Sequence, residues 1–257
     1  MADPVYRPII GFARSVFAAL GLKFDITVTE HAPTFGGGVV AMNHTGYLDF
    51  ALAGFAFRPK KRLVRFMAKK EVFDHKVSGP LMRGMKHIPV DREAGGGSYA
   101  AAVDACRHGE LVGVFPEATI SQSFELKEFK TGAARIAMEA GVPLIPVVLW
   151  GSQRVMTKGR KRDFRRGQSI RIVVGEPFSP APGTDPVVVT QDLKARMQAL
   201  LEQARSTYRG TQRDADDTWW IPAAAGGTAP TLEAAEAENA QVRADRAAKR
   251  AARDAAH

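Results

Sequence analysis

Short apolar runs alternate with segments of helical periodicity between residues 25 and 208. The runs are rich in β-branched residues, which predicts strands at 26–29, 38–42, 63–68, 111–115, 144–150 and 169–174. In between, apolar residues recur every three or four positions, which predicts helices at about 47–57, 98–108 and 131–140, and a later helix carrying Leu193, Met197, Leu200, Leu201 and Ala204. This alternation is typical of an α/β domain built on one central sheet.

An amphipathic helix is predicted at the N-terminus, within residues 1–24. Apolar residues recur at helical spacing over 5–20, with Arg7 and Arg14 nearly opposite them; they are Val5, Ile9, Phe12, Val16 and Leu20. Two placements fit this pattern: the helix packs on the core, or its apolar stripe lies on a membrane surface. The helix can also do both with different parts of its surface.

A change of composition after Gly210 predicts a domain over 25–210 and an extension over 211–257. The last 35 residues contain 15 Ala among scattered charges. We expect this extension to be mobile and helical from about 230 to 254. The adjacent Trp219 and Trp220 are more typical of packing against the domain than of ligand binding.

The net charge of +9 belongs to the domain and not to the extension. Residues 211–257 carry six Lys and Arg against eight Asp and Glu, which leaves +11 on residues 1–210. The cations gather in two blocks: 58–70 contains no acid, and 154–171 contains only Asp163. Such blocks predict an anionic partner, which can be nucleic acid, an anionic membrane surface or a phosphorylated small molecule. Aromatic residues are not interleaved with the cations and no nucleic-acid-binding motif occurs, so a nucleic-acid-binding module is the lesser alternative.

Cysteine content and hydropathy exclude several classes of protein. Cys106 is the only cysteine, so no internal disulfide can form, and no zinc-ligand spacing is present. We expect no metal and no cofactor, and a reducing, cytoplasmic environment. No apolar run reaches the length of about 18 residues that a membrane-spanning helix requires, so we expect no such helix.

The segment 39–49 is the strongest candidate for chemistry. Its apolar strand runs directly into a polar turn, the place where α/β proteins expose reactive groups, and this turn contains His44 and Asp49. Histidine is suited to proton transfer at neutral pH. Asp49 can fold back across the turn and accept a hydrogen bond from one ring nitrogen, which leaves the other as a base. The pair alone is weak evidence, because Asp49 would also be favourable in the first turn of a helix.

Three later segments strengthen the case for the His44–Asp49 pair. Residues 84–92 form a short strand that ends in a cation, residues 114–119 a strand whose turn presents a carboxylate, and residues 142–147 an apolar strand opened by proline. Their order after a His-x-x-x-x-Asp turn resembles the four sequence blocks of the glycerolipid acyltransferases. Within this family the chain resembles the bacterial 1-acylglycerol-3-phosphate (lysophosphatidate) acyltransferases, over about residues 25–180. The resemblance implies a single α/β acyltransferase domain with a central mixed sheet flanked by helices.

The resemblance also implies a role for each residue that matches a block. His44 would be the general base that activates the acceptor hydroxyl, and Asp49 would orient it. Arg92 would bind the acceptor phosphate, for which a guanidinium is well shaped, although an ion pair with Asp91 or Glu93 is the structural alternative. Glu117 would contact the glycerol moiety. Lesser substrate-binding candidates are Lys69 and Lys130 for the phosphate, Thr119, and Pro146 for the acyl or donor site.

The third block departs from the family pattern at two positions. The family reads Phe-Pro-Glu-Gly-Thr-Arg-Ser, whereas this chain has Ala118 in place of the glycine and Ile120 in place of the arginine. Alanine disfavours a left-handed turn at that point. Without the arginine, either another cation holds the acceptor phosphate, or the acceptor is another lysolipid, such as lyso-ornithine lipid.

The resemblance implies an enzyme of phospholipid biosynthesis that forms no covalent acyl-enzyme. The donor would be acyl-CoA or an acyl carrier protein, and the acceptor lysophosphatidate or another lysolipid. The chain would lie at the cytoplasmic face of the membrane as a peripheral or monotopic protein, docked by its first helix and its basic blocks, and nucleic acid would not be a partner. A non-catalytic lipid-binding relative is the remaining alternative.

Overall fold

A computed structural model describes residues 4–27, 29–91 and 96–254. These described residues form two compact units, one within residues 1–120 and 128–210 and the other within residues 121–127 and 211–257. The first unit holds both blocks of cations and the predicted site.

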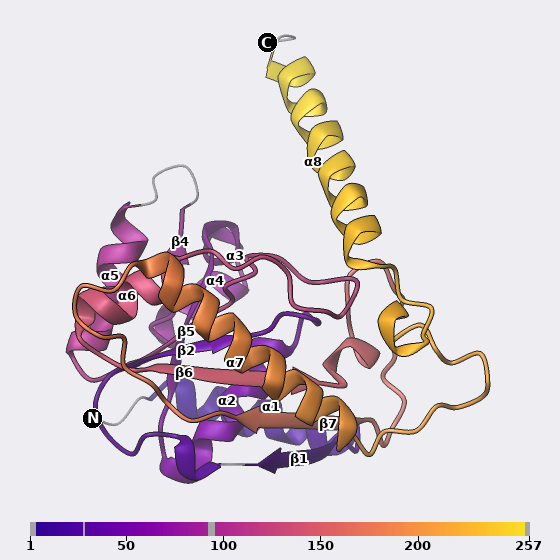
Figure 1. Cartoon of the computed structure of the whole chain (residues 1–257), viewed down its shortest axis with the longest axis horizontal. Coiled ribbons are helices and arrows are strands. Elements are labelled where there is room, and N and C mark those ends of the chain that lie inside the picture. Colours follow the sequence, from indigo (N-terminus) through magenta and orange to yellow (C-terminus); the bar gives the residue numbers. More distant parts are fainter. Residues whose placement is uncertain (1–3, 28, 92–95, 255–257) are drawn as a thin grey trace. The chain divides into compact units, whose positions relative to one another are not determined.

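A seven-stranded mixed sheet forms the centre of the first unit (Figure 1). Its strand order is β1-β7-β6-β2-β5-β3-β4. The five strands β6, β2, β5, β3 and β4 are mutually parallel, whereas β7 runs antiparallel to β6 and parallel to β1. The strands are β1 (Lys23–Thr27), β2 (Gly38–Met42), β3 (Val64–Lys69), β4 (Ile88–Val90), β5 (Leu111–Val114), β6 (Leu144–Trp150) and β7 (Ser169–Val174). The predicted α/β domain with a central mixed sheet is confirmed.

Helices cover both faces of this sheet (Figure 1). Those of the first unit are α1 (Tyr6–Ala19), α2 (Asp49–Phe57), α3 (Lys70–Asp74), α4 (Ser78–Gly84), α5 (Gly96–Arg107), α6 (Gly132–Ala140) and α7 (Pro186–Ser206), with 3-10 turns η1 (Thr29–His31), η2 (Arg58–Lys60) and η3 (Ser152–Arg154). The helices α1 and α2 lie on one face, and α5, α6 and α7 on the other. The short helices α3 and α4 were not predicted, because five and seven residues are too few to display a helical period.

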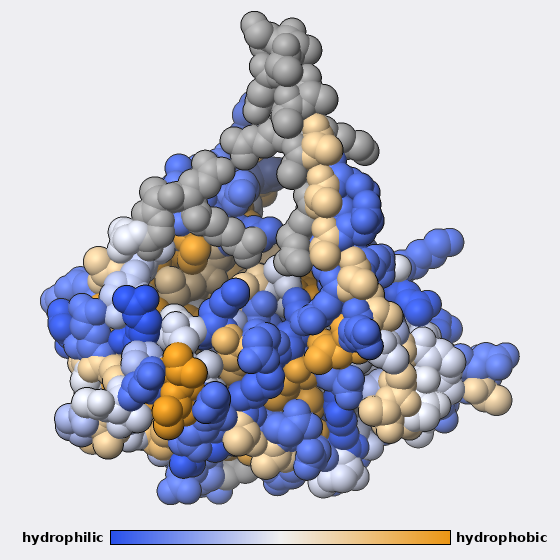
Figure 2. Space-filling model, turned by 45° about the horizontal axis from the view of Figure 1, so that its top comes forward, coloured by the Kyte–Doolittle hydropathy of each residue, from blue (hydrophilic) through white to orange (hydrophobic). Residues whose placement is uncertain are grey.

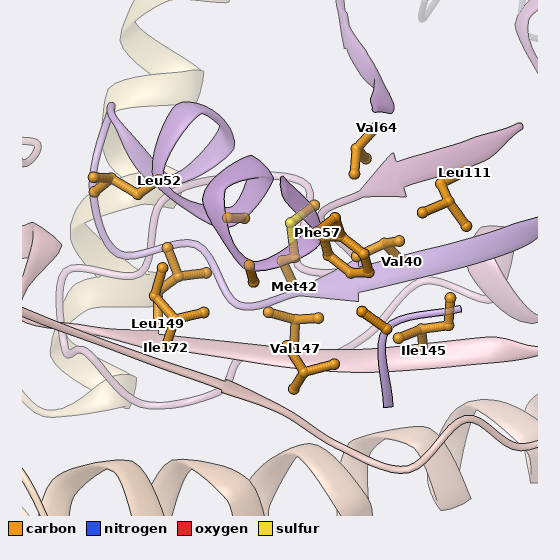
Figure 3. Packing of buried hydrophobic residues seen from close by; sticks show 14 of the residues in the cluster. Val40, Met42, Leu52, Phe57, Val64, Leu111, Ile145, Val147, Leu149 and Ile172 are labelled. Carbon is orange, nitrogen blue, oxygen red and sulfur yellow. The ribbon is translucent and has the colours of Figure 1, made fainter. Parts of the chain in front are cut away.

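One hydrophobic core lies between the sheet and its α1–α2 face (Figure 3). Alternate residues of β2 and β6, such as Val40, Met42 and Val147, point to this face and pack against Leu52 and Phe57 of α2. All residues of β2 and β6 are buried, as expected for central strands covered on both faces. The core therefore fixes β2, and with it the turn that comes after β2.

The helix α1 has one packed side and one free side. Tyr6 and Phe17 are buried, and Phe17 packs against the rings of Phe24 and Phe55. Phe12 and Val16, one turn apart, are 71% and 37% exposed. Thus α1 docks on the core and still presents an apolar stripe. On the face seen in Figure 2, hydrophobic residues reach the surface in separate patches among hydrophilic ones.

The second unit combines the C-terminal segment with residues 121–127. It contains η4 (Ala223–Ala225) and α8 (Leu232–Asp254), which lies within the segment expected to be helical. Trp219 packs edge-on against Phe124 at a centroid distance of 6.2 Å. The boundaries 1–24, 25–210 and 211–257, and the mobility of the extension, stay predictions.

Candidate functional site

His44 and Asp49 form a hydrogen-bonded pair just beyond the carboxyl end of β2. The distance from His44 Nδ1 to Asp49 Oδ2 is 3.0 Å. Because an ionised carboxylate only accepts hydrogen bonds, this contact selects the neutral tautomer in which Nδ1 carries the proton and Nε2 has a lone pair. The His44 side chain is 20% exposed and that of Asp49 is 0% exposed. The imidazole can therefore reach a substrate, while the carboxylate supports it from beneath.

The backbone of the turn holds Asp49 in place. The N–H groups of Thr45 and Gly46 donate to Asp49 Oδ2 at 2.7 and 2.8 Å, so this oxygen accepts three hydrogen bonds in all. The other oxygen, Oδ1, is buried and has no hydrogen-bond partner among the described residues. The orientation of the carboxylate is thus set at Oδ2, the atom that also faces the imidazole.

Asn43 ties the start of the turn to the neighbouring strand. Its side chain donates from Nδ2 to the carbonyl of Leu149 at 3.0 Å and accepts at Oδ1 from the N–H of Leu149 at 2.8 Å. The amide group therefore replaces one backbone rung between β2 and β6. These two bonds hold Asn43 in place where the backbone leaves the sheet and the turn begins.

The segment after β6 supports the turn from the other side. Thr157 Oγ1 donates to the carbonyl of Thr45 at 2.6 Å, and the N–H of Tyr47 donates to the carbonyl of Met156 at 2.9 Å. A Cβ on Gly46 would lie only 3.0 and 3.1 Å from the carbonyl oxygens of Met156 and Ser152. This close approach explains the glycine between His44 and Asp49.

The chain that follows β5 contacts His44 twice. The Phe115 ring stacks on the imidazole at a centroid distance of 4.1 Å and an interplanar angle of 22°. The buried carboxylate of Glu117 accepts from the backbone N–H of His44 at 2.9 Å through Oε1. Phe115 therefore fixes the ring, and Glu117 fixes the backbone that carries it.

Ala118 closes the turn that brings Glu117 back to His44. Its N–H donates to the carbonyl of Phe115 at 2.9 Å, and its φ is +60°. The left-handed turn therefore forms without glycine. Alanine disfavours this conformation, and the hydrogen bonds of Glu117 and Ala118 hold the turn in spite of that preference.

Replacing Ala118 by glycine is expected to stabilise the first unit by about 1 kcal/mol, because glycine removes the steric cost of the left-handed conformation. Thermal or urea unfolding of the intact chain measures this change. The control is Ala100→Gly on the exposed side of α5, which should destabilise by about 1 kcal/mol. Equal destabilisation by both substitutions would contradict the claim that the left-handed conformation of Ala118 is strained.

The site lies where two neighbouring parallel strands send their helices to opposite faces. The strands β2 and β5 pair in register from Gly38 and Leu111 to Ala41 and Val114. The helix after β2 is α2, on one face, and the helix after β5 is α6, on the other. Open α/β sheets bind ligands at the carboxyl ends of such a strand pair. The topology thus presents His44 and Glu117 where a substrate can approach.

The other candidate residues are placed less closely around His44. Lys69 ends β3, the strand next to β5, and is exposed, as is Lys130. Thr119 is half-buried, two residues after Glu117. Pro146 is buried inside β6 opposite Ala41, so it lies within the sheet and not at its edge. Arg92 lies outside the described residues.

Several residues that build the site were not singled out for a role by the sequence. Phe115 and Asn43 lie in the recognised blocks, yet nothing in the blocks shows that they contact His44 and Leu149. The support from Met156 and Thr157 has no local signal, because these residues are more than 100 positions away. The glycine at 46 was the one available clue to a close contact.

Comparisons with known proteins show the family of the chain. The chain matches the family described as Acyltransferase over residues 23–150. It is 32% identical to the 1-acyl-sn-glycerol-3-phosphate acyltransferase of Bacillus subtilis (strain 168) over 172 residues, which are 66% of this chain and 81% of that protein. The chloroplastic 1-acyl-sn-glycerol-3-phosphate acyltransferase of Arabidopsis thaliana is 25% identical over 184 residues, 68% of this chain and only 50% of that longer protein.

A solved structure shares the fold. It is the 1-acyl-sn-glycerophosphate (LPA) acyltransferase PlsC from Thermotoga maritima, with a TM-score of 0.67 and 21% sequence identity, covering 79% of this chain and 80% of that one.

Proposed function

The chain belongs to the acyltransferase family, and we propose that it moves a fatty acyl chain from a thioester donor to the free hydroxyl of lysophosphatidate, which yields phosphatidate. The observation that carries the proposal is the His44–Asp49 pair, with Nδ1 bound to the carboxylate at 3.0 Å and the ring partly exposed. The names of the similar proteins support the choice of acceptor. The donor is acyl-CoA or an acyl carrier protein.

In this mechanism His44 acts through Nε2. The imidazole takes the proton of the acceptor hydroxyl while the oxygen attacks the thioester carbonyl. Asp49 stabilises the imidazolium that forms. The tetrahedral intermediate then expels the thiolate, which takes the proton back from Nε2, and the acyl chain is left as an ester on the acceptor.

No protein nucleophile takes part in this scheme. Burial raises the pKa of the Cys106 thiol to about 12, and a thiol in that state is a poor nucleophile. Its sulfur lies 3.8 Å from the carbonyl of Gly38, at the start of β2, whereas His44 follows the end of that strand. Cys106 is therefore suited to packing and not to forming an acyl-enzyme.

The acceptor phosphate is expected beside the carboxyl ends of β5 and β3, the strands on one side of β2. Lys69 ends β3, and the N–H of Lys130 donates to the carbonyl of Pro116, just after β5, at 2.9 Å. Both lysines are exposed, and Arg92 is proposed as the main phosphate ligand. Ile120 is 7% exposed and provides no charge. This observation favours the second candidate acceptor, lyso-ornithine lipid, which needs fewer cations.

A panel of lysolipid acceptors with a labelled acyl donor tests the proposed function. Lysophosphatidate should give the highest kcat/KM. A higher kcat/KM for lyso-ornithine lipid would show that this lipid, and not lysophosphatidate, is the preferred acceptor. Absence of transfer to every lysolipid would contradict the proposed acyltransferase activity. Both acyl-CoA and acyl carrier protein should be offered as donors.

Glu117 provides a separate test of how the site is held together. Glu117→Ala should lower kcat about 10²-fold, the cost of misplacing a catalytic group by about 1 Å. Glu117→Gln should keep most of the activity, because an amide oxygen can still accept from the His44 N–H. Steady-state kinetics measure both. A rise in the KM for the acceptor at constant kcat would instead indicate the substrate-binding role that the family resemblance assigns to Glu117.

We also propose that the protein works at the cytoplasmic surface of the membrane. Among residues 4–27, 29–91 and 96–254, no helix is sufficiently long and apolar to cross a bilayer. A lysolipid acceptor resides in the membrane, and the exposed Phe12 and Val16 of α1 can enter the headgroup region from one side.

A further inference from the structure

The loop between β6 and β7 carries cations that the proposed catalysis does not use. Residues 158–166 contain six Lys and Arg against one acid; the cations are Lys158, Arg160, Lys161, Arg162, Arg165 and Arg166. The single acid, Asp163, is occupied by Arg165, whose Nε and Nη2 donate to it at 3.0 and 3.1 Å. In the described part of the chain, Lys161 and Arg162 are exposed and have no ion-pair partner. The loop therefore holds an excess of positive charge at the surface.

This basic loop is joined to the C-terminal end of α1. Arg166 Nη1 donates to the carbonyl of Ala19 at 2.7 Å, and the N–H of Gly167 donates to the carbonyl of Leu20 at 3.3 Å. Both acceptors lie at the C-terminal end of α1, the helix that exposes Phe12 and Val16. Within the loop, Phe164 is 49% exposed among the cations. Exposed apolar and basic side chains thus share one connected region of the first unit.

The residues directly before the loop, 152–157, contact the catalytic turn. Besides the bonds from Thr157 to Thr45 and from Tyr47 to Met156, the hydroxyls of Thr45 and Ser152 lie 3.1 Å apart. The basic loop begins directly after these contacts, at Lys158. The basic loop is thus continuous in the chain with the residues that support the turn carrying His44.

We propose that the loop 158–166, together with the exposed stripe of α1, binds the anionic surface of a lipid bilayer and presents the catalytic turn to acceptors in it. The inference rests on the proposed function, since it explains how a lysolipid reaches His44. Basic residues are attracted to anionic headgroups, and exposed aromatic residues enter the headgroup region. An acidic carrier protein would match the cations, but it would leave the apolar side chains on α1 uncovered.

Vesicle binding by the full chain tests this surface. The variant Lys161→Gln/Arg162→Gln should bind phosphatidylcholine vesicles containing phosphatidylglycerol roughly 30-fold more weakly than the wild type, given the attraction of each cation to anionic lipid. The matched control, Arg58→Gln/Lys61→Gln in the other basic block, removes the same charge from two exposed residues and should bind almost normally. Equal weakening by both variants would show a general charge effect and overturn the proposal.

A kinetic measurement separates the bilayer from the donor as the partner. With a short-chain acceptor dissolved as monomers, the loop variant should keep the kcat and the KM for the donor, which also shows that it is folded. A raised KM for the donor with unchanged vesicle binding would assign the loop to the donor and overturn the proposal. Phe164→Ser should weaken vesicle binding without touching a charge, and normal binding by this variant would contradict the role of the aromatic residue.

The same assays keep the two proposals apart. Vesicle binding that depends on the loop, in a protein that acylates no lysolipid, would contradict the proposed function alone. Acyl transfer by a protein whose vesicle binding is unchanged in the loop variant would contradict the inference about the loop alone.

Discussion

Replacing His44 by alanine is expected to lower kcat for acyl transfer by about 10³-fold, within the range that a positioned general base contributes. The substitution removes Nε2, the atom that takes the proton of the acceptor hydroxyl. The KM values should change little, because the imidazole is assigned to proton transfer and not to binding. Steady-state kinetics with the best acceptor of the lysolipid panel measure the effect.

The fold of the His44→Ala protein has to be shown independently. His44 is partly exposed, and its backbone N–H bonded to Glu117 is retained in the variant. The unfolding temperature should therefore stay near that of the wild type. Near-normal kcat in a folded variant would remove His44 from the mechanism.

Replacing Asp49 by asparagine is expected to lower kcat by roughly 10²- to 10³-fold, less than the ~10⁴-fold loss where the same change inverts the histidine tautomer. The reason lies in the three hydrogen bonds that converge on Oδ2. The N–H groups of Thr45 and Gly46 require an acceptor there, so the amide oxygen of the new side chain takes that position. Nδ1 keeps its acceptor, and the negative charge that stabilises the imidazolium is lost.

Comparison with Asp49→Ala distinguishes the two roles of Asp49, which are to accept the hydrogen bonds of the turn and to provide a negative charge. It leaves the N–H groups of Thr45 and Gly46 without their acceptor in a buried site, which costs roughly 1–3 kcal/mol per unsatisfied group. We expect a lower unfolding temperature and a lower kcat than for Asp49→Asn. If Asp49→Asn instead proved as inactive and as unstable as Asp49→Ala, that result would contradict the expectation that the asparagine oxygen still accepts from Nδ1 and keeps the histidine tautomer. Thermal unfolding and steady-state kinetics of the two variants together decide this.

Local features of the site could be predicted from the sequence. The strand 38–42 is bounded as predicted, because its all-apolar run ends at Asn43. The spacing of five residues lets Asp49 reach back to His44 within one turn, a short-range geometry that the order of residues specifies. The alternation of apolar runs and helical segments likewise predicted the α/β sheet.

Contacts between distant segments could not be predicted in this way. Phe115 stacks on His44 because β5 inserts between β2 and β3, although two strands separate it from β2 in the chain. Strand order depends on the packing of the whole sheet, and the sequence around Phe115 does not encode it. The family resemblance gave Glu117 a role toward the substrate, whereas the structure shows its carboxylate bonded to the His44 backbone.

Contacts between distant segments also explain two other features that were not predicted. They are the left-handed conformation of Ala118 and the grouping of residues 121–127 with the C-terminal segment. The intrinsic preference of alanine opposes a positive φ, and tertiary hydrogen bonds outweigh this preference. Likewise, the apolar Phe124 finds its aromatic partner, Trp219, 95 positions further along the chain. Local sequence reasoning fails where a distant partner determines the conformation.

A rapid-quench experiment with a donor labelled in its acyl group tests most directly whether His44 acts as a base in a direct transfer from donor to acceptor. Enzyme mixed with the donor alone should carry no covalent label and release no thiol. Addition of the acceptor should move the label to lysolipid without a protein-bound intermediate. Stoichiometric acyl-protein, or a burst of free thiol before the acceptor is added, would show that a protein group, His44 included, acts as a nucleophile and would contradict direct transfer.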